Sequence, residues 1–304
     1  MAIQGKRLSD LTLVPNVSSC GIMPVVQNSN TLMVPVSNLG TGIKTFSEIN
    51  SLSSVYATAK IVGGSDTNSS NHNYSSIPGG KDNCTLAVFN FIGGGRYNKT
   101  CGVYSSIVGG KQNKVCDDFG ALAGGCSNTV SGVGGFIGAG ISNCVKGNRN
   151  NILGGFGNQI KGTDACISTD SIIVGGCENT LSGCQNFIGG GRGNINHSVN
   201  NGTIGGGEYN CAIGRSSTVA GGGRNYAIGM ESTIAGGYGN CSIGRCATVG
   251  GGVSNQSIGN YSTIGGGSAN RAGCRSTVAG GYFNNAEGNC SFVGGGYCNK
   301  ANGE

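Results

Sequence analysis

A repeat of fifteen residues constrains this chain more than any other feature. From Ile77 onward the sequence repeats an aliphatic residue, a small residue, two glycines or near equivalents, two variable residues and an asparagine. Eleven of the fourteen steps between successive asparagines are 15 residues long, and the others are 14, 16 and 21. Self-similarity at a fixed short period indicates a solenoid, in which each repeat forms one coil of a stack.

Two columns of the repeat are nearly invariant. The aliphatic column comprises Ile77, Ile92, Ile107, Leu122, Ile137, Ile152, Ile173, Ile188, Ile204, Val219, Ile234, Val249, Ile264, Val278 and Val293. The asparagine column comprises Asn83, Asn98, Asn113, Asn128, Asn143, Asn158, Asn179, Asn194, Asn210, Asn225, Asn240, Asn255, Asn270, Asn284 and Asn299. We expect the first column to form a core ladder. The asparagines have two interpretations, as turn residues with left-handed backbone or as a ladder of side-chain amides, and both are structural.

Composition excludes the other glycine-rich folds. The chain has 62 glycines among 304 residues but only four prolines, without a glycine at every third position, so it is not collagen. Two glycines in every fifteen residues would cost a helix about 2 kcal/mol per repeat. The sequence therefore predicts an all-β protein, a β-roll or β-helix solenoid of two short extended segments per coil. Because one such coil buries little, we expect several chains to share a core, as a homotrimer.

The chain divides into three regions. Residues 1–58 contain little glycine, and a predicted hairpin turn at 28–30 suggests a small β-rich head. Residues 59–90 form a degenerate start of the shaft, and residues 91–304 form its regular part. The six extra residues near 163–171 predict a loop on one side of the solenoid.

The cysteines and titratable residues do not suggest a catalytic or metal site. The 15 cysteines are odd in number, no Cys-x-x-Cys pair occurs, and no export signal is recognisable, so we expect reduced thiols and no zinc site. His72 and His197 do not recur in register, and the adjacent Asp117 and Asp118 would point to opposite faces of a strand. One further carboxylate cluster comprises Asp164, Asp170 and Glu178. We predict no enzyme activity and no cofactor.

Aromatic residues give the strongest indication of binding. Residues of this kind precede the asparagines at Tyr97, Tyr209, Tyr238, Tyr282 and Tyr297, close to several arginines. They could hold sugars of a cell envelope, or they could shield the corners between coils and pack against a neighbouring chain.

Two stretches resemble known structural proteins. The repeat Ser-Thr-Ile-Ala-Gly-Gly-x-x-Asn-x-x-x-Gly, seen at 232–244, is similar to the glycine-rich repeats of bacteriophage tail fibres and to the head repeats of trimeric autotransporter adhesins. The adhesin heads fold as trimeric left-handed β-rolls, and the likeness covers about three-quarters of the chain. The stretch from Lys6 to Pro15, with Gly21–Val26 and Val34–Leu39, resembles the opening of phage tail and virion proteins, where it docks the fibre to the particle.

These resemblances imply a virion protein. We recognise neither the export signal nor the C-terminal membrane domain of the autotransporters, so we expect a phage fibre or spike subunit assembled in the host cytoplasm. Its expected partners are copies of itself, other virion proteins through the N-terminal segment, and a host-surface glycan or a protein at the tip. We expect neither nucleic-acid binding nor membrane insertion.

Two alternatives stay open. One is a free-standing adhesive or ice-binding solenoid, because threonines recur at 203, 218, 233, 248, 263 and 277, although the same column holds Phe91 and Phe136 upstream. The other is a tailspike that depolymerises glycans, which the scarcity of carboxylates disfavours.

Overall fold

The computed structural model describes residues 22–27, 30–35, 61–64, 67–70, 72–162 and 169–303. The chain separates into two units, Met1–Thr58 and Ala59–Glu304. In the first unit, β1 (Ile22–Gln27) pairs antiparallel with β2 (Asn30–Pro35), and Gln27 lies opposite Asn30. This antiparallel pairing flanks the predicted hairpin turn, of which residues 28 and 29 lie outside the described residues.

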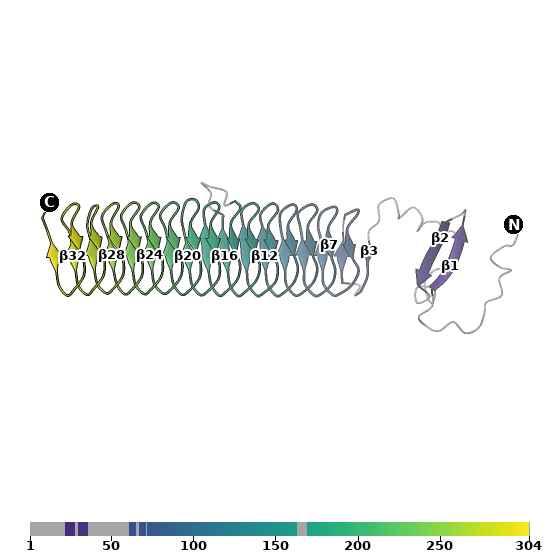
Figure 1. Cartoon of the computed structure of the whole chain (residues 1–304). Helices are drawn as coiled ribbons and strands as arrows, with labels where there is room; N and C mark the ends of the chain where they lie inside the picture. The colour runs from purple at the N-terminus through teal and green to yellow at the C-terminus, as the bar shows by residue number, and fades with distance from the viewer. Residues whose placement is uncertain are drawn as a thin grey trace, which may run out of the picture. The chain divides into compact units, whose positions relative to one another are not determined.

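The second unit is a β-solenoid built from two parallel sheets of sixteen strands each (Figure 1). The strands of sheet B are β3 (Ile61–Val62), β5 (Ser76–Ile77), β7 (Phe91–Ile92), β9 (Ser106–Ile107), β11 (Ala121–Leu122), β13 (Phe136–Ile137), β15 (Asn151–Ile152), β17 (Ile172–Ile173), β19 (Phe187–Ile188), β21 (Thr203–Ile204), β23 (Thr218–Val219), β25 (Thr233–Ile234), β27 (Thr248–Val249), β29 (Thr263–Ile264), β31 (Thr277–Val278) and β33 (Phe292–Val293). The strands of sheet C are β4 (Ser69–Ser70), β6 (Cys84–Thr85), β8 (Lys99–Thr100), β10 (Lys114–Val115), β12 (Thr129–Ser131), β14 (Cys144–Lys146), β16 (Gln159–Lys161), β18 (Thr180–Ser182), β20 (Ile195–Asn196), β22 (Cys211–Ala212), β24 (Tyr226–Ala227), β26 (Cys241–Ser242), β28 (Gln256–Ser257), β30 (Arg271–Ala272), β32 (Asn285–Ala286) and β34 (Lys300–Ala301). The segment 59–90 already carries strands of both sheets.

Each strand turns one residue outward and one inward. In β25, Thr233 is half-buried and Ile234 has no exposed surface, as the alternation of a strand requires. The whole aliphatic column is buried, with exposures of 0–1% from Ile77 to Val278 and 6% at Val293. One chain therefore completes this core by itself. A partner chain is not required to cover the aliphatic column, contrary to the physical reason for which a shared core was expected.

The inward positions of sheet C change in size along the shaft. They are occupied by Thr85 and Thr100 in the first coils, by larger residues such as Val130 and Leu181 in the middle, and by small residues such as Ala227 towards the C-terminus. The inward side chains of sheet B are therefore aliphatic in every coil, whereas those of sheet C vary in size along the shaft.

The asparagine column joins every coil to the next. The side-chain amide of Asn240 donates to the carbonyl of Gly236 at 3.0 Å in its own coil and to that of Gly252 at 2.9 Å in the following coil. Its Oδ1 accepts the backbone N–H of Asn255 at 2.9 Å. Of the two interpretations, the amide ladder is correct and the left-handed turn is wrong, because the residue with positive φ is the one before the asparagine, such as Tyr209 (φ 54°).

The second glycine of each pair is required by the stacking. Gly237 has a φ of +85°, and a Cβ there would meet the backbone of Gly252 and lie 2.7 Å from the Asn240 amide nitrogen. A side chain at this position would therefore collide with the next coil and with the asparagine clamp. All fifteen coils from Gly80 to Gly296 keep glycine in this column.

The insertion leaves the stack in register. The backbone N–H of Asn179 donates to Asn158 Oδ1 at 3.0 Å, although 21 residues separate them. Arg149 and Asp170, on the two sides of the insertion, form a bidentate ion pair with Nε–Oδ1 and Nη2–Oδ2 distances of 2.7 and 2.9 Å. The predicted loop itself lies largely at 163–168, outside the described residues. Within the part of the chain that the structure describes, no helix is long and apolar enough to span a bilayer.

Candidate binding surfaces of the shaft

The predicted tyrosines lie along one corner of the shaft, which we call the aromatic corner. It follows the glycine pair and joins each strand of sheet B to a strand of sheet C. One row of parallel bridges runs along it from Lys81 to Tyr297 and includes Tyr238 and Tyr282. Tyr97 and Tyr209 lie one position later, in the row with left-handed backbone. The structure therefore separates the predicted set into two adjacent rows.

Two of these rings cover glycines of the preceding coil. A Cβ added to Gly193 would lie 2.6 Å from the ring of Tyr209, and one added to Gly223 would lie 3.1 Å from the ring of Tyr238. The Arg224 guanidinium carbon is 5.8 Å from the Tyr238 ring centroid. These contacts favour corner shielding as the role of Tyr209 and Tyr238.

The C-terminal end of the aromatic corner is different. Tyr282 meets Phe283 edge to face at a centroid distance of 4.5 Å and stacks on Tyr297 at 5.6 Å. Tyr297 is 69% exposed, and its hydrogen bond with Cys298 raises its pKa. This cluster offers apolar ring surface together with phenol hydroxyls, which suits a sugar ring. Tyr97 lies near the other end of the shaft, where Arg96 packs 4.5 Å from its ring centroid.

Sequence reasoning missed a second aromatic row, at the opposite corner. Tyr74, Phe89, Tyr104 and Phe119 stack in succession, with centroid distances of 4.9, 4.7 and 5.3 Å and interplanar angles of 5–7°. Their fifteen-residue spacing was the available signal. Because each inner ring is covered on both faces by its neighbours, the row exposes ring edges and is a poor platform for stacking a sugar.

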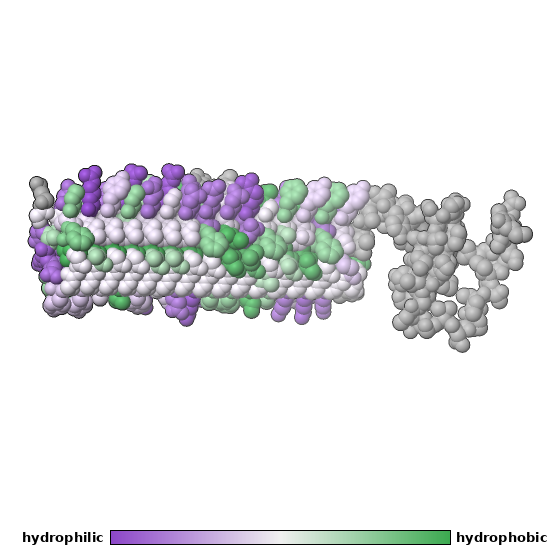
Figure 2. Space-filling model, in the orientation of Figure 1, coloured by the Kyte–Doolittle hydropathy of each residue, from purple (hydrophilic) through white to green (hydrophobic). Residues whose placement is uncertain are grey.

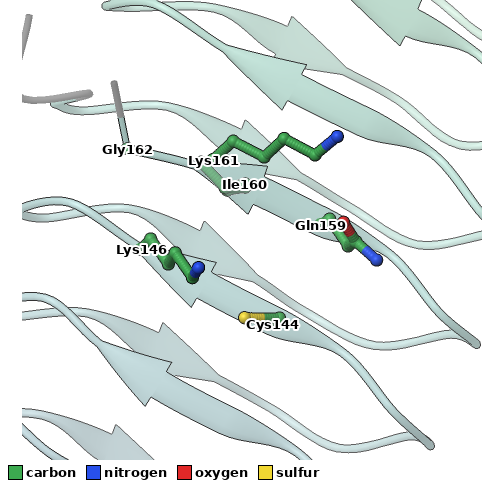
Figure 3. A pocket seen from close by; sticks show the side chains of 6 residues that line it. All are labelled: Cys144, Lys146, Gln159, Ile160, Lys161 and Gly162. Carbon is green, nitrogen blue, oxygen red and sulfur yellow. The ribbon is translucent and has the colours of Figure 1, made fainter. Parts of the chain in front are cut away.

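The outer face of sheet C holds a cationic hollow of about 390 Å³. Lys146 and Lys161 extend into it from the neighbouring strands β14 and β16, beside Cys144 (Figure 3). Burial raises the pKa of Cys144. Further along the same face, His197 Nδ1 lies 2.9 Å from Ser182 Oγ, and burial, helped by the charge of Lys161, lowers the pKa of His197. Among the described residues no carboxylate lines the hollow, so these residues can attract an anion but offer no paired acid and base.

The candidate catalytic carboxylates have separate neighbours. Asp170 pairs with Arg149, Glu178 packs over Gly157, and Asp118 accepts the backbone N–H of Val103 at 2.7 Å. Asp164 lies outside the described residues. Among the residues that the structure describes, no three His, Cys, Asp or Glu side chains are grouped as a metal site would require.

Comparison with known proteins adds no family. No protein-family model matches this chain, and no curated protein matches its sequence. The functional argument therefore rests on the fold and on these surfaces.

Proposed function

We propose that this protein is a structural fibre or spike subunit of a bacteriophage particle. In this proposal residues 1–58 attach to the virion and the solenoid projects from it towards the host surface. The observation that carries the proposal is the continuous asparagine ladder from Asn68 to Asn299, in which every coil is clamped to the next. A stack of sixteen coils about 4.8 Å apart is about 70 Å long, and a continuous parallel sheet of sixteen strands runs along each of its two sides.

The surfaces of the shaft suit adhesion better than catalysis. The exposed cluster of Tyr282, Phe283 and Tyr297 supplies aromatic surface for a host glycan, and the hollow with Lys146 and Lys161 supplies positive charge for an acidic one. Strands β14 and β16, which carry the two lysines, and the corner with Tyr282 and Tyr297 are both held in parallel ladders of the stack.

Electron microscopy with an antibody against the shaft tests this function. We expect gold label on fibres or spikes of particles released from the host that makes the protein. Purified protein should also compete with particles for adsorption to host cells, and Tyr297→Ala should compete less well than Tyr209→Ala, because Tyr209 shields a corner. Label on cells but never on particles would overturn the virion assignment.

A second candidate is favoured by one observation. Six successive threonines, from Thr203 to Thr277, stand in register on the outer face of sheet B, each pair joined in the parallel ladder. A flat, regular threonine array is the surface expected of an ice-binding solenoid. Thermal hysteresis and ice recrystallisation assays distinguish this candidate, with Thr233→Lys, which interrupts the array, as the informative variant.

A further inference from the structure

The outer face of sheet B carries no charged residue in any of fifteen coils. The charge-free face comprises three columns: the outward residue of each strand and the two residues after the inward aliphatic, from Ser76 to Gly295. In the C-terminal half these columns hold threonine, alanine and glycine, as at Thr233, Ala235 and Gly236, except that β33 presents the exposed Phe292. In the N-terminal half they include large exposed apolar residues, such as Val108 (61% exposed). In a chain with 32 formally charged residues, this exclusion marks one whole side of the shaft.

Sheet C has the opposite character. Its outer face presents Lys99 directly opposite Lys114 in the parallel register, followed by Lys146, Lys161 and Arg271. If identical chains met in register through this face, each of these cations would approach its own copy, and like charges placed opposite one another are destabilising. The charge-free face carries no such penalty. Figure 2 shows hydrophilic side chains along the upper edge of the rod and in smaller groups along its lower edge, with a mostly pale band between them.

The first glycine of each pair supplies an independent observation. Gly206, Gly221, Gly236, Gly266 and Gly280 lie outside the left-handed region, and a Cβ added to any of them would meet nothing within 4 Å. Ala139 occupies the same column, so a coil can hold a side chain here. At Gly190, Gly251 and Gly295 the backbone itself favours glycine, with φ of 146–152°, but in the other coils the chain's own packing does not explain why glycine fills the column. Close approach of another chain's backbone would explain the glycines of this column.

We infer that copies of this chain associate in parallel through the charge-free face, around an axis along the shaft. Only an equally straight partner with the same rise per coil can follow this face over its length, and a second copy has both properties. Four residues of each coil span about 13 Å and fifteen coils about 70 Å, which gives about 900 Å² per chain. That area matches the roughly 800 Å² per partner of a stable interface. The inference rests on the proposed fibre function and on the homotrimer expected from the sequence, and it names the contact face of that homotrimer.

Charge insertion tests the face. Ala235 and Ala220 are exposed in the single chain, so Ala220→Lys with Ala235→Lys leaves the coil intact but introduces two charges per chain into the contact. Gln256→Lys, exposed on sheet C, is the matched control. Light scattering of the full chain in reducing buffer should give three times 30.3 kDa for the wild type and for the control. The double variant should give 30.3 kDa with an unchanged circular dichroism spectrum.

A second measurement distinguishes association through the charge-free face from association through residues 1–58 alone. Ala235→Cys should be protected from a bulky maleimide in the assembled protein, whereas Gln256→Cys should be modified, as read by peptide mass mapping. A monomeric wild type, equal modification at the two sites, or dissociation by Gln256→Lys alone would overturn the inference. Failure of the virion proposal looks different: the chains would associate as described, but the antibody would not label particles.

Discussion

Asn240 and Asn255 are joined by a 2.9 Å hydrogen bond in which the side-chain oxygen of the first accepts the backbone N–H of the second. Both residues are completely buried. The same amide also donates to carbonyls of its own coil and of the next, so one side chain satisfies groups in two successive corners. Polar groups buried in this way stabilise the stack only while every member has its partner.

Asn240→Ala should destabilise the shaft by about 2–4 kcal/mol, because it leaves a buried N–H and two carbonyls with fewer hydrogen bonds. Urea unfolding followed by circular dichroism measures the change. Asn289→Ala, at an exposed asparagine, is the control and should change the unfolding free energy by less than about 0.5 kcal/mol. Equal effects of the two variants would contradict the role assigned to the ladder.

The two glycines of one pair should respond differently to alanine. Gly237→Ala introduces a Cβ against the next coil at a φ of +85° and should cost more than about 2 kcal/mol. Gly236→Ala introduces its Cβ into open space and should leave the folding of the single chain unchanged or improve it by about 0.4–1 kcal/mol. Thermal unfolding of both variants at the same low concentration provides the comparison, and the opposite order would refute the assignment.

Ser232→Ala should raise stability by about 1 kcal/mol. The Ser232 hydroxyl is buried and has no hydrogen-bond partner among the described residues, and Ala247 occupies the same column one coil later. Ser276→Ala is the matched control with the opposite expected sign, because Ser276 Oγ donates to the carbonyl of Gly288 at 2.8 Å. Calorimetry of the two variants checks the difference.

Alkaline pH should weaken the shaft. Burial raises the pKa of the thiols of Cys144, Cys211 and Cys241. A folded-state pKa above the unfolded value means that the folded chain binds more protons, so this contribution is complete below about pH 8.5 and is lost as pH rises through the higher folded pKa.

The measurement is the unfolding midpoint in reducing buffer at pH 7.5 and 10.5. The wild type should lose more stability over this interval than a variant in which the three cysteines are replaced by serine. Because lysines and tyrosines titrate equally in both proteins, the difference between them isolates the thiols. Identical losses would show that the buried thiols do not contribute.

The period and the two invariant columns were enough to predict the two-sheet solenoid. A core position and a buried amide position each accept few residue types, so both recur visibly in the sequence. The position with left-handed backbone before each asparagine shows no such pattern, because it accepts many residue types. Tyr97, Arg224 and Ala269 all occupy it. The conformation is imposed by the stack, in which, for example, the Arg224 N–H donates to the carbonyl of Glu208 at 2.9 Å.

The isoleucines after the second inward column show a further limit. Ile213, Ile228 and Ile243 are 39–43% exposed on the outside of the shaft. Each follows a buried small residue such as Ala212, and adjacent residues in extended backbone face opposite sides. Hydrophobicity alone suggests burial for these residues, whereas the alternation within the coil places them outside. The tyrosines of the aromatic corner occupy the two variable positions before the asparagine, but the different contacts of these two rows could not be predicted from the sequence.

The asparagine clamp has a consequence for how such a protein can change. Every coil presents the same donors and acceptors on its two sides, and Asn158 still bonds Asn179 across an insertion. Removing or duplicating fifteen residues would therefore rejoin equivalent partners without disturbing the rest of the stack. Each coil adds about 4.8 Å to the length of the shaft. Selection on the length of the shaft can therefore add or remove one coil at a time while the residues at both ends stay unchanged.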